Sequence, residues 1–209
     1  MELAKYVGCD ASYYQKLHDH QELFQQNNWM VPELDTLRQF DARSVVELGC
    51  GNGKFLAAAA NHFERIVGID WARAPAIEAT LAAHHNTRFF QADLIDGFPD
   101  VGTFDLLLSA DFLEHLPTAS IPSALARYQS RARFHFHKIA CYDDGHSHLT
   151  IQDPVDWLAM FKSISSSYSI FSIEKRRGDP KSLVCCITNH NPCDEYSREL
   201  RNTVSLTMS

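Results

Sequence analysis

Short apolar runs alternate with helix-like patterns along the chain from Ser44 onward. The runs hold Val, Ile, Leu and Phe at consecutive positions, which is typical of strands that are buried on both faces. Between them, apolar residues recur every three or four positions, as in helices that cover a sheet. The pattern predicts strands at 44–50, 65–70, 87–93, 104–111, 133–142, 168–177 and 182–189. It predicts helices at 53–63, 74–85, 118–131 and 153–164.

This alternation predicts an α/β fold, a Rossmann-like three-layer sandwich with a mostly parallel sheet of seven strands between two layers of helices. The last two strands flank a turn at Gly178-Asp179-Pro180, so we expect them to pair with each other and to give the sheet an antiparallel last strand. Sheets of this kind bind ligands beyond the carboxyl ends of their strands. The residues that follow each strand are therefore the first candidates for a site.

The chain changes character before and after this alternating body. In residues 1–43, apolar and aromatic positions from Tyr14 to Phe24 recur at helical spacing, and Val31-Pro32 opens a second short helix. We expect these helices to form an N-terminal helical lid. The body spans 44–190 and is expected to be one domain, and the polar residues 191–209 are expected to be a C-terminal extension.

Composition narrows the class of function. The 209 residues carry a formal net charge of −7, which disfavours nucleic acid and anionic membrane surfaces as partners. No apolar stretch approaches the ~20 residues of a membrane span, and the charged N-terminus lacks the apolar core of a signal peptide. The six cysteines form no CxxC pair and are expected to be reduced, buried thiols. We therefore expect a cytoplasmic protein without membrane insertion.

The stretch "VVELGCGNGKF" ends a predicted strand with glycines at 49, 51 and 53. Glycine lets the backbone turn sharply and lets a ligand lie against the main chain. The helix that follows offers unpaired N–H groups at its start, which favour an anionic part of a ligand. A nucleotide cofactor is therefore expected. Lys54 stands where the dinucleotide pattern G-x-G-x-x-G has its third glycine, which disfavours a nicotinamide oxidoreductase.

The pattern E-x-G-x-G-x-G, followed by an acidic residue at the end of the second strand, resembles motif I of class I S-adenosylmethionine-dependent methyltransferases. "VGID" is similar to the second-strand motif of that family, "QADL" to the third, and "FDLLLSADFLEHL" to the segment after the fourth strand. The resemblance extends over about Ser44 to Asn189. It implies a methyltransferase domain at 44–190 and S-adenosyl-L-methionine as the cofactor.

The resemblance also implies roles for residues at strand ends. The Asp70 carboxylate would accept hydrogen bonds from both ribose hydroxyls, or cap a helix instead. Glu47 would bind the methionyl ammonium, directly or through water, or be structural. Trp71 would lie against the adenine face or simply pack, and Asp93 would bind the adenine amino group or cap. The cofactor-binding residues expected on this basis are Glu47, Gly49, Gly51, Gly53, Asp70, Trp71, Asp93, Leu94, Ala110 and Asp111.

The implied reaction is an in-line displacement at a methyl carbon, in which alignment is the main contribution of the protein. A general base is needed when the acceptor is a hydroxyl or a protonated amine. His115 follows the fourth strand and His148 lies in the loop after the fifth, so these two and Tyr14 of the lid are the predicted catalytic residues. His148 is the preferred base. A packing role for His115 and a surface-loop role for His148 are the alternatives.

Other histidines stand in less favourable positions. His135 and His137 alternate with phenylalanines inside the fifth strand, which favours core positions. The loop "DDGHSH" contains four residues with ligand chemistry, Asp143, Asp144, His146 and His148. Magnesium prefers oxygen ligands, and nothing else in the sequence completes a zinc site. We therefore predict no metal ligands.

The acceptor is the least determined part of the prediction. The stretches "YYQKLHDHQELFQQNNWM" and "HSHLTIQDPVDWLAMF" are similar to methyltransferases of surface-polysaccharide pathways, including a type that methylates a terminal phosphate on a sugar chain. This likeness implies a small-molecule or glycan acceptor, with a hydroxyl or phosphate oxygen, near Tyr14, His148 and Trp157. The chain has "SADF" where enzymes that methylate base amines have an Asn/Asp-Pro-Pro-aromatic stretch. A protein acceptor and a non-catalytic binding subunit are the alternatives.

Overall fold

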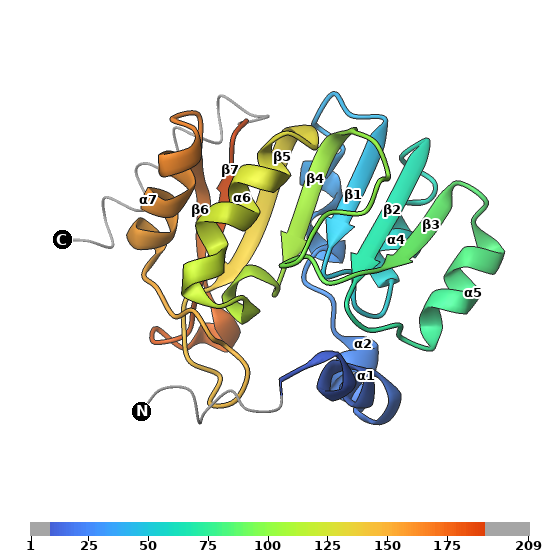
Figure 1. The fold of residues 1–209 in the computed structure, drawn as a ribbon, viewed down its shortest axis with the longest axis horizontal. Helices are drawn as coiled ribbons and strands as arrows, with labels where there is room; N and C mark the ends of the chain where they lie inside the picture. Colours follow the sequence, from blue (N-terminus) through green and yellow to red (C-terminus); the bar gives the residue numbers. More distant parts are fainter. Residues whose placement is uncertain (1–8, 191–209) are drawn as a thin grey trace.

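The computed structural model describes residues 9–190, and a seven-stranded sheet runs through them (Figure 1). The strand order is β3-β2-β1-β4-β5-β7-β6. β1 to β5 pair in parallel, and β7 pairs antiparallel with both β5 and β6. The strands are β1 (Ser44–Leu48), β2 (Arg65–Asp70), β3 (Thr87–Gln91), β4 (Phe104–Ala110), β5 (Ala132–Ala140), β6 (Ser169–Lys175) and β7 (Leu183–Thr188). The predicted mostly parallel sheet with an antiparallel last strand is confirmed.

Helices cover both faces of the sheet and give the predicted three layers. The helices of the body are α4 (Lys54–Ala59), α5 (Ala76–Ala83), α6 (Ile121–Gln129) and α7 (Pro154–Ile164). Successive side chains of a strand point to opposite faces. Val46 therefore joins the core beneath α6 and α7, whereas Val45 joins the core beneath α4 and α5. Cys185 and Cys186 divide between the two cores in the same way.

The N-terminal segment forms short helices at one end of the sheet. They are α1 (Ala11–His20), α2 (Glu22–Gln26), η2 (Val31–Glu33) and α3 (Leu34–Leu37). The Asp10 carboxylate caps α1 by accepting a hydrogen bond from the Tyr13 N–H at 2.9 Å. Figure 1 shows α1 and α2 at the end toward which the arrows of β1, β2 and β4 point. The first eight residues of the predicted lid and the predicted extension at 191–209 lie outside the described residues.

Short helical turns lie between some of the longer elements. They are η3 (Leu113–His115), η4 (Thr118–Ser120) and η5 (Arg176–Gly178). η3 comes just after β4 and η5 just after β6, so both stand at strand ends. No helix among residues 9–190 is long and apolar enough to cross a bilayer. The cysteines described in this range are free thiols, as expected, and Cys193 lies outside it.

The sequence placed His135 and His137 in the core and Trp157 near the acceptor, and the structure confirms only the first of these placements. His135 and His137 are buried in β5, where His137 Nδ1 lies 2.8 Å from Ser109 Oγ, so their core positions are confirmed. Trp157, expected near the acceptor, is fully buried between α7 and the sheet together with Phe161. That expectation was wrong because the apolar stripe of α7 faces the core and not the ligand edge of the sheet.

The core position of Trp157 gives a first test. Trp157→Ala should lower the free energy of unfolding by about 3–5 kcal/mol, because it leaves a cavity between α7 and the sheet. Val155 lies on the same helix but is 60% exposed. Val155→Ala should therefore change the free energy of unfolding by less than about 0.5 kcal/mol. Chemical denaturation measures both, and equal effects would contradict this packing.

Candidate active site

The bend after β1 requires glycine at three positions. Gly49, Gly51 and Gly53 have φ angles of +68°, +51° and +73°, which other residues rarely adopt. A Cβ atom at Gly49 would lie 2.8 Å from Phe112 Cδ2, and one at Gly53 would lie 2.6 Å from Ile77 Cδ1. The bend is therefore a bare main-chain surface, and α4 begins directly after it.

The Asp70 carboxylate, at the end of β2, holds this glycine bend. It accepts hydrogen bonds from the Gly51 N–H at 2.8 Å and from the Ala72 N–H at 2.9 Å. These two bonds use different oxygens, and a carboxylate has about four acceptor positions, so Asp70 can still accept a hydrogen bond from a ligand hydroxyl. Burial raises the pKa of Asp70, and the N–H groups of Ala72, Gly51 and Trp71, with the nearby His18, counteract part of that rise.

Glu47 is a buried carboxylate in β1. It is 2% exposed, and its Oε2 has no hydrogen-bond partner. Burial raises the pKa of Glu47 well above its ordinary value, and the nearby Asp70 adds to the rise. A buried polar atom without a partner costs free energy. A positively charged group of a ligand would remove that cost.

The N-terminal helices are joined to the glycine bend by side-chain amides. Gln15 Nε2 donates to the Arg73 carbonyl at 2.8 Å, and Gln15 Oε1 accepts from the Arg73 N–H at 2.8 Å. Asn52 Nδ2 donates to the Asn27 carbonyl at 2.7 Å. These bonds join the segment around α1 and α2 to both β1 and β2 at their carboxyl ends. The segment therefore covers the edge where a lid was predicted.

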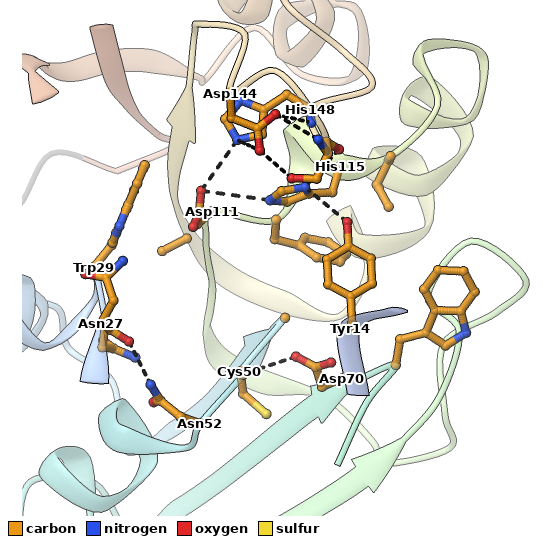
Figure 2. A pocket seen from close by; sticks show the side chains of 18 of the residues that line it. Tyr14, Asn27, Trp29, Cys50, Asn52, Asp70, Asp111, His115, Asp144 and His148 are labelled. Carbon is orange, nitrogen blue, oxygen red and sulfur yellow. Dashed lines mark hydrogen bonds and ion pairs between the residues drawn. The ribbon is translucent and has the colours of Figure 1, made fainter. Parts of the chain in front are cut away.

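A cavity of about 510 Å³ lies at this edge, between the glycine bend and the turn that joins β6 to β7 (Figure 2). Its volume is in the range of pockets that bind small molecules. All the predicted cofactor residues except Gly53 line it, and so do Tyr14, His115 and His148. Trp157 does not line it.

Residues after β2 and β3 form one wall of the cavity. Asp93 Oδ1 accepts a hydrogen bond from the Ile95 N–H at 2.8 Å, which turns the chain after β3. Leu94 is buried beside it. The Trp71 ring centroid lies 6.3 Å from that of Tyr14. This wall therefore combines apolar and aromatic surface with one carboxylate.

Sequence reasoning missed another wall. Arg176, Arg177, Asp179 and Ser182 line the cavity from the turn between β6 and β7. Because β7 is antiparallel to both neighbours, β6 runs parallel to β5 and ends at the ligand edge. The turn signal in the sequence indicated a hairpin, but it did not indicate that the turn of this hairpin lies at the cavity. The Arg176 guanidinium carbon lies 4.3 Å from the ring centroid of Trp29.

Asp111, His115 and His148 meet at the far end of the cavity, and we refer to them as the Asp-His cluster. Figure 2 shows their side chains pointing toward one another. Asp111 Oδ1 lies 3.9 Å from Nε2 of both histidines, and the two imidazole centroids are 4.9 Å apart. Asp111 directly follows β4 and has φ +54°, a conformation that Asp adopts more readily than most residues. His148 arrives from the loop after β5, the neighbour of β4 in the sheet.

Backbone carbonyls orient both histidines of the cluster. His148 Nδ1 lies 2.5 Å from the Tyr142 carbonyl oxygen, and His115 Nδ1 lies 3.1 Å from the Ser147 carbonyl oxygen. A carbonyl oxygen only accepts, so each Nδ1 carries a hydrogen and donates it. Both Nε2 atoms are therefore directed to Asp111.

Buried acids set the charge of the cluster. Burial lowers the pKa of His115, but Asp111 and Glu114 outweigh it and raise the pKa to about 9. Burial, with Asp111 nearby, raises the pKa of Glu114 to about 8. Burial lowers the pKa of His148 below its ordinary value. The Tyr14 hydroxyl lies 3.2 Å from His115 Nδ1, and burial raises its pKa, so it stays protonated near pH 7.

Asp144 organises the loop that carries His148. Its Oδ1 accepts hydrogen bonds from the N–H groups of His146, Ser147 and His148 at 3.0, 2.8 and 3.0 Å. The Ser147 hydroxyl donates to Oδ2 at 2.5 Å. Burial opposes ionisation of Asp144, but these donors outweigh it and hold the pKa well below its usual range. An anchored, charged Asp144 thus fixes the loop behind the cluster.

The sequence analysis predicted no metal ligands, whereas the structure brings three possible ligand side chains together. Asp111, His115 and His148 offer ligand atoms that all lie within 4.8 Å of one another. Of the residues in the loop "DDGHSH", only His148 belongs to this group of possible ligands. The other two members come from the end of β4 and from η3.

Residues 45–133 match the family model described as a methyltransferase domain. A comparison with curated protein sequences finds no match. Many solved structures share the fold. The three reported next are 14–15% identical to this chain, a level at which the likeness shows the fold.

The 1,6-didemethyltoxoflavin-N1-methyltransferase of Burkholderia thailandensis has a TM-score of 0.70 at 14% identity, over 85% of this chain and 84% of that one. Magnesium protoporphyrin IX methyltransferase of Synechocystis has a TM-score of 0.62 at 14% identity, over 86% and 98%. The N-methyltransferase NodS of Bradyrhizobium japonicum has a TM-score of 0.58 at 15% identity, over 82% and 97%. Residues 45–133 therefore match a methyltransferase domain, and the described residues share the fold of these solved methyltransferases. Both findings agree with the family predicted from the glycine motif.

Hydrogen exchange tests how the N-terminal helices are held against the carboxyl ends of the strands. Gln15→Ala removes both hydrogen bonds to Arg73, so the amides of α1 should exchange about tenfold faster, as expected for the loss of ~1.4 kcal/mol. Lys16→Ala, on the exposed side of the same helix, should leave that exchange unchanged. If α1 exchanges equally in both variants, the two hydrogen bonds of Gln15 to Arg73 do not hold the N-terminal helices in place.

Proposed function

We propose that this methyltransferase moves a methyl group from S-adenosyl-L-methionine to an oxygen atom of a small molecule or a glycan. The observation that carries the proposal is a single cavity that joins the glycine bend to the Asp-His cluster and Tyr14. When bound, S-adenosyl-L-methionine supplies a methyl group that its sulfonium has already activated. The chain then has to bind and orient both partners, which accounts for about 7–11 kcal/mol of barrier in well-aligned reactions.

The described residues fit this cofactor. Glu47 has a buried, unpartnered Oε2 that suits the methionyl ammonium. The Asp70 carboxylate has acceptor positions beyond those that Gly51 and Ala72 occupy, which suits the ribose hydroxyls. The wall formed by Trp71, Asp93 and Leu94 suits a flat base with an amino group. The cofactor would also contact Gly49, Gly51, Ala110 and Asp111, with Gly53 acting through the shape of the bend.

The similar structures add support for a small acceptor. The methyltransferases of Burkholderia thailandensis, Synechocystis and Bradyrhizobium japonicum were each solved with S-adenosylhomocysteine. The first of them also holds bound 1,6-didemethyltoxoflavin. A cavity of about 510 Å³ in the same fold suits a ligand pair of this kind better than an extended macromolecule.

The Asp-His cluster gives a hydroxyl acceptor a place to lose its proton. His148 keeps its hydrogen on Nδ1, where the Tyr142 carbonyl holds it, and presents the Nε2 lone pair. Nε2 would receive the hydroxyl proton, and Asp111 Oδ1 at 3.9 Å would stabilise the resulting imidazolium. The protonated Tyr14 hydroxyl would donate a hydrogen bond that orients the acceptor oxygen.

The wall between β6 and β7 suits an anionic group on the acceptor. Arg176 and Arg177 both line the cavity, and arginine forms strong, directional bonds with phosphate and carboxylate. Such a wall supports a phosphorylated or acidic acceptor. If the phosphate oxygen itself takes the methyl group, the reaction needs no base.

Cofactor binding is tested first. S-adenosylhomocysteine at 100 times its Kd should stabilise the wild-type chain by ~2.7 kcal/mol in a thermal-shift measurement. Glu47→Gln removes the charge that would pair with the ammonium, so S-adenosylhomocysteine affinity should fall about 10- to 100-fold. Glu64→Gln, at an exposed ion pair with Arg43 far from the cavity, is the control and should bind like the wild type. Absence of any shift in the wild-type chain would leave a non-catalytic binding subunit as the better reading.

Turnover tests the acceptor end. A methyl-labelled donor is offered with a panel of sugars, sugar phosphates and phenols, and separately with denatured cell protein. His148→Gln should lower turnover of a hydroxyl acceptor about 100-fold or more while S-adenosylhomocysteine affinity stays unchanged. His62→Gln, at an exposed position, is the control. Label in the protein fraction alone would replace the small-molecule proposal with a protein acceptor.

A further inference from the structure

The Asp-His cluster has the composition of a metal site. It offers two imidazole nitrogens and one carboxylate oxygen, from three separate points of the chain, within 4.8 Å of one another. His148 is 3% exposed, and His115 is also largely enclosed, whereas one side of the cluster borders the cavity. Enclosed ligands on one side and a cavity on the other are the arrangement of an open, reactive metal site.

The hydrogen bonds behind the two histidines support the same reading. Each Nδ1 donates to a backbone carbonyl, from Tyr142 for His148 and from Ser147 for His115. Histidines that bind a metal through one nitrogen nearly always donate the other N–H to a carbonyl or carboxylate, which fixes the ring. Both rings are thus already oriented with Nε2 toward Asp111. A pair of surface histidines would not need this support.

The distances are compatible with one ion. Two ligand atoms that each lie about 2.1 Å from a tetrahedral ion are about 3.4 Å apart. Asp111 Oδ1 lies 3.9 Å from Nε2 of both His115 and His148. The ligand atoms of the two histidines lie within 4.8 Å of each other. The two pairs with Asp111 therefore have to shorten by about 0.5 Å, and the pair of histidine nitrogens by at most about 1.4 Å, to close around an ion.

The surrounding charge also favours a cation. Glu114 is fully buried next to the cluster, and its Oε2 has no hydrogen-bond partner. Asp144 Oδ2 lies 3.9 Å from His148 Nε2. Besides its own Asp111, the cluster therefore has two acidic neighbours, Glu114 and Asp144. The Oε2 atom of Glu114 is buried without a hydrogen-bond partner.

We propose that Asp111, His115 and His148 bind a divalent transition-metal ion, and that the acceptor oxygen takes a free position on that ion. The second half of this statement rests on the proposed function; the first half does not. Two imidazoles with one carboxylate suit Zn²⁺, Mn²⁺, Fe²⁺ or Co²⁺, whereas Mg²⁺ and Ca²⁺ prefer sites made of oxygen. A bound ion would orient an acceptor oxygen and lower the pKa of a hydroxyl bound to it, so that the hydroxyl could lose its proton to solvent water. The Nε2 lone pair of His148 would then bind the ion and would not act as the base.

Metal binding by the full-length chain tests the proposal without any methyl transfer. The chain is stripped with a chelator and titrated with ZnCl2 by calorimetry, and with MnCl2 by the loss of the free-ion signal in electron paramagnetic resonance. We expect one equivalent of Zn²⁺ to bind, and MgCl2 to bind at least tenfold more weakly. His115→Gln, His148→Gln and Asp111→Asn should each weaken Zn²⁺ binding by 10- to 100-fold or more. Asn tolerates the left-handed conformation at position 111, so that variant keeps the backbone.

His146→Gln is the matched control, because His146 lies in the same loop and contacts Asp144 but is outside the cluster. It should bind Zn²⁺ as the wild type does. The proposal is overturned if the wild-type chain binds neither Zn²⁺ nor Mn²⁺, if the three cluster variants bind Zn²⁺ undiminished, or if His146→Gln loses as much affinity as they do. The S-adenosylhomocysteine thermal shift, measured on His115→Gln and His148→Gln, shows that these chains are folded. A lost shift in the wild type with Zn²⁺ binding intact would instead reject the proposed function and keep the metal site.

Discussion

The structure depends on a main-chain bend that side chains cannot enter. Three glycines with positive φ join β1 to α4, and the Asp70 carboxylate ties the bend to the end of β2 through the Gly51 N–H. A Cβ atom at Gly51 would lie 3.4 Å from His18 of α1. The N-terminal segment therefore lies close to the bend, and the cavity lies where the strand ends, the bend and this segment meet.

The two ends of the cavity carry different chemical groups. At the glycine end, Glu47 and Asp70 are buried acids, and Glu47 has an oxygen without a partner, so this end is complementary to a cationic ligand that also carries hydroxyls. At the far end, the carboxylate of Asp111 faces two imidazoles whose outer nitrogens are held by carbonyls. The first end is built to bind, and the second carries the groups that can take a proton or a cation.

Local patterns predicted much of the fold and part of the site. Apolar runs located the strands of residues 9–190, most clearly β1, β2, β4 and β5, because burial on both faces of a parallel sheet leaves few polar positions. The glycine motif located the bend because only glycine adopts its backbone conformation at low cost. Trp157 was misplaced because a helical stripe in the sequence shows that one side is buried but not which surface buries it. Arg176 was missed because its place at the cavity follows from the strand order, in which β6 ends at the ligand edge.

The sequence by itself determined the alternation of strands and helices, the glycine bend and the acids that flank it, since each depends on neighbours within a few residues. Only the tertiary structure decided that Asp111, His115 and His148 form one cluster. β4 and β5 are adjacent and parallel, so the segments that follow them leave the sheet at the same edge, and Asp144 then folds the later loop back toward the earlier one. Such a meeting is a property of strand order and loop geometry, which no short stretch of sequence records.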